Sequence, residues 1–231
     1  MEINNFFLLN MAERVENEGS TLFLNYSELS NVSGILNKRK IKFFVYYPYK
    51  NSEKAIIYKG KEPSIKLLKI ITKETLKHSD ILGSLFANQI SPNQYGDIII
   101  DKGNYYVMIL ESMFPYFQTQ FSKIGKWYVE FEIVSIDKIK DFEYEFEILN
   151  YFVTSLRIDN VVSSITSLSR SSVDDMFVKK DVLLWYESVK KVKNLKEKDI
   201  ISIRRFGKYK INEILDKNKK GKIKIELYKY K

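Results

Sequence analysis

The 231-residue sequence contains no cysteine and a single histidine, His78. Without cysteine, the chain has no disulfide framework, no thiolate metal site and no thiol nucleophile, and a reducing compartment such as the cytosol is the simplest setting. A histidine-based triad would need an unmarked serine, because no G-x-S-x-G motif occurs. The phosphate-binding motifs G-x-x-x-x-G-K-[ST] and G-x-G-x-x-G are absent too. We therefore predict no enzymatic activity, no catalytic residues, no cofactor and no metal site.

Long hydrophobic runs are also missing. No stretch of about 18 uninterrupted apolar residues is present to span a bilayer. The first residues, MEINNFFLLN, have no basic segment and only a four-residue apolar run, so they do not resemble a signal peptide. With 45% hydrophobic and 29% charged residues, the sequence is typical of globular domains rather than of a disordered tail. We expect a cytoplasmic protein.

Positive charge is concentrated at one end of the chain. Residues 1–150 carry 18 basic and 19 acidic side chains, whereas residues 151–231 carry 20 basic and 10 acidic ones. The whole surplus behind the net charge of +9 therefore lies in the last third. This concentration, more than the overall basic composition, makes the last third the candidate for a phosphate-binding surface.

The first 150 residues predict an α+β arrangement. A helix is expected from Glu2 to Glu18, ended by Gly19. Aromatic and β-branched runs then predict, in order, a strand hairpin over 42–47 and 54–58, a strand over 65–72, a helix over 73–89, a second hairpin over 96–110, a short helix over 112–124 and a strand over 126–135. The second hairpin, short helix and last strand make a small α+β layer.

Acidic and apolar residues alternate over DFEYEFEI, residues 141–148. A period of two predicts a half-buried strand with an exposed acidic face. Same-face spacing of carboxylates is ordinary sheet patterning, so we favour this interpretation over a carboxylate metal cluster. The charge balance changes just after this strand, around residues 151–155, without a Gly- or Pro-rich linker. We place the domain boundaries at 1–74, 75–150 and 151–231.

The basic third predicts two short helices followed by strands. Apolar residues at helical spacing follow Arg157, and Ser169 is placed to cap a second helix that begins at Arg170 and runs through Phe177. Arginines and free backbone amides at two helix starts would then lie on one side, which suits phosphate binding. The expected strands and turn lie around 182–185, 200–204, 208–215, 217–222 (turn) and 223–228.

Specific motifs in this region resemble the RNA-binding domain named after small-subunit ribosomal protein S-four, also called the αL motif. They are LRxD from Leu156, SRS at 169–171, a short Val-rich strand and LKEKDIISIRRFGKYKI at 195–211. Three further motifs are similar to the bacterial YlmH family: HSDILGS at 78–84, YGDIII at 95–100 and RRFGKYKINEI at 204–214. The resemblance implies an N-terminal α/β region over 1–74, an RRM-like middle module over 75–150 and an S-four domain over 151–231.

For function, the resemblance implies a protein that docks on ribosomal RNA, on the large ribosomal subunit, with tRNA as a further possible partner. Relatives are associated with rescue of stalled large subunits carrying peptidyl-tRNA and with cell division. The residues that match the family's RNA face are Arg157, Ser169, Arg170 and Ser171 on the helices and Arg204, Arg205, Lys208 and Lys210 in the strand region. To these we add cations placed to neutralise phosphates, namely Lys179, Lys180, Lys190, Lys191 and Lys193.

The chain departs from the family pattern at three turns. Lys180-Asp181 stands after the second helix, where the family usually has a glycine. Near Trp185 the polar turn residue expected after the next strand is replaced. The stretch Arg204-Arg205-Phe206-Gly207-Lys208 stands where Arg-Gly-Phe-Gly-Arg is usual. These changes keep or increase the positive charge.

Structural interpretations compete with RNA contact at several positions. Arg157 and Arg170 could instead pair with Asp159 or Asp174, and the lysines at 190, 191 and 193 could be a solvated strand edge. Phe206 and Tyr209 could stack on unpaired bases, although core packing is favoured. In the first half, we favour a helix-start role for Ser79 or Asp80 beside a packed His78, close helix packing at Gly83, and a turn at Gly96-Asp97.

Two other classes of function stay open. The S-four domain is also fused to pseudouridine synthases and to tyrosyl-tRNA synthetase, so an RNA-modifying or tRNA-charging enzyme accessory is the alternative. The sequence has neither HIGH nor KMSKS, and no aspartate set in the pseudouridine synthase pattern. Binding to an anionic membrane would need the basic residues on an amphipathic helix, and the strand-like C-terminus argues against it.

Overall fold

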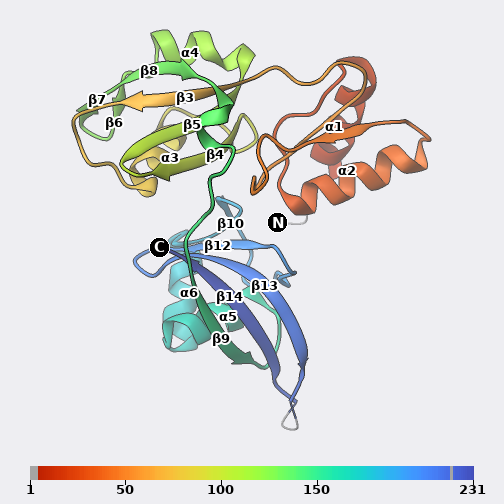
Figure 1. Cartoon of the computed structure of the whole chain (residues 1–231). Helices are drawn as coiled ribbons and strands as arrows, with labels where there is room; N and C mark the ends of the chain where they lie inside the picture. Colours follow the sequence, from red (N-terminus) through yellow and green to blue (C-terminus); the bar gives the residue numbers. More distant parts are fainter. Residues whose placement is uncertain (1–4, 219–220) are drawn as a thin grey trace. The chain divides into compact units, whose positions relative to one another are not determined.

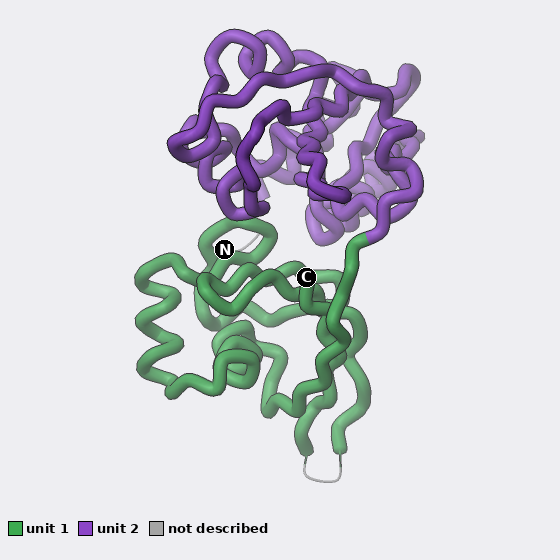
Figure 2. The backbone as a smooth tube through the Cα atoms, turned by 60° about the vertical axis from the view of Figure 1, so that its left-hand side comes forward, with its two compact units in different colours: residues 1–2, 144–231 green, residues 3–143 purple. Residues whose placement is uncertain are grey.

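The computed structural model describes residues 5–218 and 221–231. It divides into two compact units that meet in the chain between Glu143 and Tyr144, and Figure 2 colours them separately. Both units combine helices with antiparallel sheets, so the expected α+β class is confirmed. The change in charge near residue 151 lies inside a strand rather than between the units. In the described part of the chain, no helix is long and apolar enough to cross a bilayer.

The N-terminal unit begins with two helices and a hairpin (Figure 1). These are α1 (Asn5–Asn17), α2 (Tyr26–Lys38), β1 (Phe44–Tyr46) and β2 (Ile56–Tyr58). Helix α2 is absent from the sequence-based prediction, because its stretch is rich in serine and asparagine. It forms because Asn25 and Glu28 make a capping box at its start and because Leu29, Val32 and Leu36 bury against α1 and β2.

A four-stranded antiparallel sheet follows in the same unit, with strand order β4-β5-β3-β8. Its elements are β3 (Ile65–Ile71), α3 (His78–Ala87), β4 (Tyr95–Asp101), β5 (Asn104–Leu110), η1 (Glu111–Met113), α4 (Phe114–Thr119), β6 (Lys123–Ile124), β7 (Trp127–Tyr128), β8 (Glu130–Val134) and η2 (Ile136–Ile139). The helix expected over 73–89 begins later, and the one over 112–124 is divided between η1, α4 and the strand β6.

Both faces of this four-stranded sheet are covered. Leu68 and Val107 point to the side on which α3 and α4 pack. The alternate residues Leu67, Tyr106 and Met108 point to the other side, where the cluster also contains residues from outside the sheet, namely Phe23, Tyr49, Ile56 and Ile139. The inner and outer faces alternate along each strand, as the pleat requires. This sheet therefore presents no open face to a ligand.

The C-terminal unit is a six-stranded antiparallel sheet with two helices (Figure 1). Its elements are β9 (Phe146–Val153), α5 (Ile158–Thr166), α6 (Arg170–Val178), β10 (Val182–Leu184), β11 (Glu187–Ser188), β12 (Ile200–Ile203), β13 (Gly207–Lys217) and β14 (Ile223–Tyr230). The strand order is β11-β10-β12-β13-β14-β9. The acidic strand expected over 141–148 starts only at Phe146, and the expected turn over 217–222 includes residues 219–220, which lie outside the described residues.

One face of the six-stranded sheet carries the core of the unit. Tyr209, Ile211, Ile225 and Leu227 are buried on this face, in one cluster with Val161 and other apolar residues of α5 and α6. Core packing of Tyr209, which we favoured from the sequence, is confirmed, and burial raises its pKa to about 12. Because side chains alternate along a strand, the neighbours of these residues point to the other face of the sheet.

Candidate nucleic-acid interface

Helix α5 begins directly after Arg157, which is its N-cap residue, and the buried Ile158 anchors the first turn in the core. The first amides of this helix already have acceptors. The Ile158 N–H donates to the Lys193 carbonyl at 2.8 Å, and the Asp159 N–H donates to the Lys191 carbonyl at 3.4 Å. The prediction of free amides at this helix start is therefore wrong, because a loop from elsewhere in the unit supplies acceptors.

Helix α6 does retain free amides at its start. Ser169 is the N-cap, as predicted, and its Oγ accepts the Ser172 N–H at 3.2 Å and lies 3.0 Å from the Ser171 hydroxyl. Within the described residues, the N–H groups of Arg170 and Ser171 donate to no acceptor. A helix start with two unpaired amides and an adjacent arginine side chain is suited to a phosphate oxygen.

A polar groove with a volume of about 390 Å³ lies between the starts of α5 and α6. Three cations, Arg157, Arg170 and Lys191, line it together with the carboxylates of Asp159 and Asp174. The remaining lining residues are Ser155, Asn160, Ser163 and Val173. The tertiary structure thus brings both predicted arginines and one predicted lysine to a single site.

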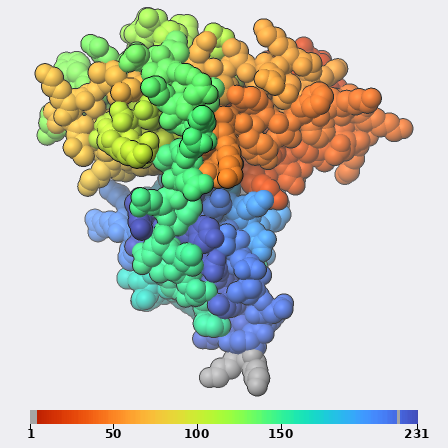
Figure 3. All heavy atoms as spheres, viewed as in Figure 1, coloured from red at the N-terminus to blue at the C-terminus, as the bar shows by residue number. Residues whose placement is uncertain are grey.

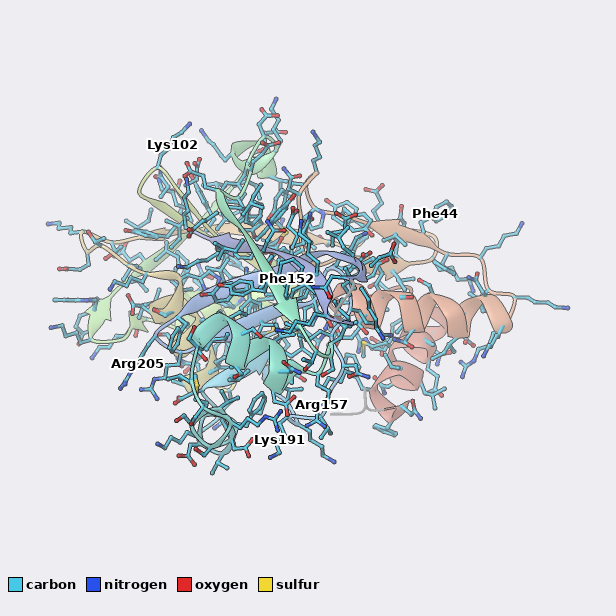
Figure 4. The ribbon with its side chains drawn as sticks, turned by 90° about the horizontal axis from the view of Figure 1, so that it is seen from below. Phe44, Lys102, Phe152, Arg157, Lys191 and Arg205 are labelled. Carbon is cyan, nitrogen blue, oxygen red and sulfur yellow. The ribbon has the colours of Figure 1, made fainter. Side chains whose placement is uncertain are left out.

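Two of the three cations in the groove are already paired with the carboxylates. The Arg157 guanidinium donates from Nε and Nη2 to the two oxygens of Asp159 at 3.1 and 2.6 Å, and this pairing raises the pKa of Arg157. Lys191 Nζ lies 2.8 Å from Asp174 Oδ2. Figure 4 shows Arg157 and Lys191 near each other. Exposed pairs of this kind contribute about 0–1 kcal/mol, so a phosphate can replace a carboxylate partner at small cost.

Three of the predicted lysines lie in a loop rather than on a strand edge. Lys190, Lys191 and Lys193 follow β11, and the Lys193 N–H donates to the Lys190 carbonyl at 3.0 Å. The interpretation of these residues as a solvated strand edge is therefore wrong. Through the carbonyls of Lys191 and Lys193, the loop closes onto the start of α5, and it brings the Lys191 side chain to the groove.

Lys179 and Lys180 lie at the opposite end of α6 from Arg170. The Lys180 N–H donates to the Phe177 carbonyl at 3.1 Å and the Asp181 N–H to the Met176 carbonyl at 2.8 Å. These two bonds make a Schellman motif, and Lys180 occupies its left-handed position with φ of 57°. Glycine, which the family usually has at this position, adopts a left-handed backbone without a steric penalty. Lysine adopts the same backbone at a cost in conformational free energy.

Arg204 and Arg205 form the turn between β12 and β13, near the same end of α6. The Phe206 N–H donates to the Ile203 carbonyl at 3.0 Å, and Arg205 has φ of 70° at the third position of this turn, where type II turns favour glycine. Arg204 Nη1 lies 3.0 Å from Asp181 Oδ1, which ties the turn to the end of α6. Four predicted cations therefore form a second basic site, away from the groove.

The third departure from the family pattern is a two-residue hairpin turn. Leu184 pairs with Glu187, so Trp185 and Tyr186 form the turn between β10 and β11, with φ values of 51° and 68°. Two consecutive positive values define a type I′ turn, which asparagine and glycine usually occupy. Both rings are buried, and Trp185 Nε1 donates to Asp199 Oδ1 at 3.1 Å. Side-chain contacts thus hold a backbone that local propensity disfavours.

Lys208 and Lys210 point to the face of the sheet away from the helices. They flank the buried Tyr209 on β13, and alternation places their side chains opposite the core. The thirteen predicted RNA-binding residues thus separate into three surfaces: the groove with the lysine loop, the Lys180 and Arg205 corner, and the open sheet face. The basic strand residues do not extend the helical surface as predicted.

The motifs of the N-terminal unit have structural partners. In HSDILGS, Asp80 Oδ2 accepts the Lys77 N–H at 2.8 Å at the start of α3, which confirms the helix-start role, and Ser84 Oγ accepts the Gly125 N–H at 2.9 Å. The expectation of close packing at Gly83 is wrong, because a Cβ there would contact nothing within 4 Å. Within the described residues, no group of acidic or histidine side chains is arranged to hold a metal ion.

Gly96 and Asp97 lie inside β4 rather than in a turn. A Cβ on Gly96 would lie 2.9 Å from a ring carbon of Phe23, so only glycine admits that ring. Asp97 Oδ2 accepts the Tyr49 hydroxyl at 2.7 Å, the Ser52 hydroxyl at 3.0 Å and the Glu53 N–H at 2.8 Å. The YGDI motif thus links residues 49–53 to the four-stranded sheet by hydrogen bonds.

Comparisons with known proteins give a family match for the segment that forms the sheet of the N-terminal unit. Residues 62–138 match the family described as the putative RNA-binding domain in YlmH. Ribosome-associated protein quality control protein P2 of Bacillus subtilis is 24% identical over 158 residues, which are 68% of this chain and 62% of that protein. The resemblance to the YlmH family is confirmed. A solved structure, the cell division protein YlmH from Streptococcus pneumoniae, aligns with a TM-score of 0.49 and 19% identity over 60% of this chain and 95% of that one.

The YlmH match extends from β3 to η2 and includes the HSDILGS and YGDIII motifs. The matched part of the chain spans 62% of the length of the Bacillus subtilis protein. Of the ion pairs considered from the sequence, the structure contains Arg157 with Asp159, while Asp174 pairs with Lys191, and the loop that covers the α5 amides was not predicted. The LRxD spacing carries the signal for the first pair, because an aspartate two residues after the N-cap arginine lies within reach of it.

Proposed function

We propose that the chain is a non-enzymatic RNA-binding protein that docks on ribosomal RNA of the large ribosomal subunit. The observation that carries this proposal is the groove between α5 and α6, where two arginines and a lysine converge beside unpaired helix amides. The surrounding unit, residues 144–231, has 20 basic and 12 acidic residues. The match of residues 62–138 to a putative RNA-binding domain supports RNA as a ligand of the chain, and the similarity to a ribosome-associated protein supports the ribosome as its location.

The topology supports an RRM-like module followed by an S-four domain. In the N-terminal unit, α3 connects β3 to β4 and α4 precedes β8, in a sheet ordered β4-β5-β3-β8. RRM modules bind RNA by stacking bases on the open face of such a sheet. Because both faces are covered here, we assign docking on ribosomal RNA to the C-terminal unit. We propose that the N-terminal unit, which holds the segment matched to a putative RNA-binding domain, contacts a ribosomal protein, tRNA or another factor.

In the proposed mechanism, the groove holds the phosphate backbone of a structured RNA. Arg170 and its helix amides bind one phosphate directly, since this arginine has no ion pair within the described residues. Arg157 and Lys191 exchange Asp159 and Asp174 for further phosphates. Such contacts fix register and orientation without reading sequence. Recognition is then electrostatic and based on shape, which suits a role in translation or in rescue of stalled ribosomes.

Sedimentation with purified large subunits tests the proposal. The full chain is mixed with subunits at about 50 and 200 mM salt, the range over which phosphate contacts weaken strongly, and centrifuged through sucrose beside the Arg157→Ala/Arg170→Ala variant. The matched control is Lys50→Ala/Lys59→Ala, which removes two exposed cations outside residues 62–138 and outside the C-terminal unit. The wild type and the control are expected in the subunit fraction, and the arginine variant at the top of the gradient.

Two results would contradict this assignment. If the wild type stays at the top with large subunits, small subunits and intact ribosomes alike, the ribosome is not the target. If the arginine variant sediments as the wild type does, the groove is not the anchor. Repeating the wild-type run with intact ribosomes tells whether the subunit must be split before the protein binds.

A further inference from the structure

We propose that the open face of the six-stranded sheet is a second RNA surface, which binds an unpaired segment by stacking its bases. This inference rests on the proposed function, because it assumes that the C-terminal unit binds RNA. The surface lies across the sheet from α5 and α6 and consists of Phe146, Ile148, Phe152, Lys210, Lys224 and Tyr228, which we call the sheet platform. Figure 3 shows the green strand β9 at the surface beside the blue strands β13 and β14.

The platform exposes apolar side chains on β9, the edge strand of the six-stranded sheet. Ile148 is 60% exposed and Phe152 is 52% exposed, while their strand neighbours Leu149, Tyr151 and Val153 belong to the core cluster. Alternation therefore puts the exposed pair on the uncovered face. In Figure 4, Phe152 on β9 lies apart from Arg157 and Lys191 of the groove. Exposed apolar groups gathered on one surface mark a binding site more often than isolated ones do.

Cations alternate with the aromatic side chains across the strands. Phe152 pairs with Lys224, Ile148 pairs with Tyr228, and Tyr228 pairs with Lys210 on its other side. Within the described residues, neither Lys210 nor Lys224 has an ion pair. Aromatic faces interleaved with cations match a single-stranded nucleic acid, which offers base faces and phosphates in alternation.

Two other features add to this chemistry. Phe146 stacks on Tyr228 with ring centroids 4.9 Å apart, which fixes the Tyr228 ring at one end of the platform. Glu226 lies on the same face and accepts the Asn212 amide at 2.7 Å. Lys210 and Lys224 outnumber this single carboxylate, so the platform has a net positive charge.

The dimensions suit a short single strand. The rows that contain Lys224 and Tyr228 are four residues apart on β14, which is about 13 Å at 3.3 Å per residue. Stacked nucleotides are spaced by about 3.4 Å, so roughly three to four bases fit between the rows. The six-stranded sheet differs in its coverage from the four-stranded sheet of the N-terminal unit. In the N-terminal unit both faces of the four-stranded sheet are covered, one of them by residues from outside the family-matched segment, whereas the C-terminal unit leaves one face of its sheet open.

Fluorescence anisotropy with two oligonucleotides tests the platform on the full chain. One probe is labelled octaadenylate, and the other is an abasic eight-unit ribose phosphate with the same charge. The variants are Phe152→Ala and Phe152→Leu, and the control is Phe44→Ala, which removes an aromatic ring that is 61% exposed in the N-terminal unit. We expect the wild type to bind octaadenylate at least about fivefold more tightly than the abasic probe, since each stacked base contributes at least about that factor.

Both Phe152 variants are expected to lose this preference for bases and to keep the affinity for the abasic probe, because leucine preserves the apolar area but lacks the aromatic face. Equal affinity of the wild type for the two probes would overturn the proposal. Equal weakening of both probes by Phe152→Ala, or no weakening, would overturn it as well. Retention of the base preference by Phe44→Ala excludes a general effect of removing an exposed ring.

The same assay separates this inference from the ribosome assignment. Arg157→Ala/Arg170→Ala is expected to keep the preference of the platform for bases while it loses the large subunit. If the wild type fails to sediment with any ribosomal particle yet prefers octaadenylate through Phe152, the ribosome proposal fails and the platform stands. If the wild type sediments through its arginines but shows no base preference, the platform fails and the groove stands.

Discussion

Replacement of Lys180 by glycine should stabilise the C-terminal unit and weaken RNA binding at the same time. Lys180 holds φ of 57° in the Schellman motif that ends α6. A left-handed backbone costs a non-glycine residue about 1–2 kcal/mol, and the extra chain entropy of glycine offsets about 0.5–1 kcal/mol of the gain. The free energy of unfolding should therefore rise by about 0.5–1 kcal/mol in Lys180→Gly.

Urea denaturation followed by tryptophan fluorescence measures this change. The chain has two tryptophans, and Trp185 lies in the C-terminal unit, so a Trp127→Phe background makes the signal specific. With a slope of about 2 kcal/mol per molar urea, the midpoint should rise by about 0.25–0.5 M. The matched variant Lys180→Ala removes the same charge but keeps the left-handed strain, so its midpoint should not rise.

RNA affinity supplies the second half of the prediction. If Lys180 contacts a phosphate, both variants should reduce the magnitude of the slope of log affinity against log salt by about 0.7–0.9. An unchanged or lower midpoint in Lys180→Gly would refute the argument that strain is kept here for the sake of charge. A rise of the same size in Lys180→Ala would also refute it, since the gain would then come from lost charge repulsion.

Three further predictions concern the remaining features. Gly96→Ala should lower the free energy of unfolding by about 1–3 kcal/mol, because its Cβ would overlap Phe23. Gly83→Ala should raise the free energy of unfolding by up to about 1 kcal/mol, because the position is open and alanine favours a helix. Urea denaturation of the two variants distinguishes these outcomes. Burial raises the pKa of Asp97. In the folded protein this carboxyl group therefore stays protonated at pH values above about 3.9, the pKa of an aspartate in the unfolded chain. The free energy of unfolding should fall as the pH rises from about 3.9 through the raised pKa. Urea midpoints between pH 3 and 8 should show a smaller fall in Asp97→Asn, and an identical pH profile would contradict the assignment. If RNA binding engages about five phosphates, log affinity should fall with log salt at a slope of roughly −3.5 to −4.5, and a salt-independent affinity would refute the electrostatic mechanism.

Local sequence determined the elements whose signals lie within one turn or one strand. Ser169 caps α6 because its hydroxyl reaches an amide three residues away, and β3 and the hairpin of β4 and β5 follow from runs of β-branched and aromatic residues. Helix α2 escaped prediction because its serines and asparagines have weak helix propensity, and burial of three residues against other elements overrides that propensity.

At the candidate site, the sequence by itself determined the excess of positive charge in the last third and the arginines at two helix starts. Only the tertiary structure decided which of these groups are available. The Lys191 and Lys193 carbonyls cover the first amides of α5 from more than thirty positions away in the chain, and the pleat of β13 turns Lys208 and Lys210 to the face opposite the groove. Contacts between residues distant in sequence depend on topology and packing, which local spacing does not encode. The concentration of positive charge and the Ser169 helix cap could therefore be predicted from the sequence, whereas the division of the cations into separate surfaces could not.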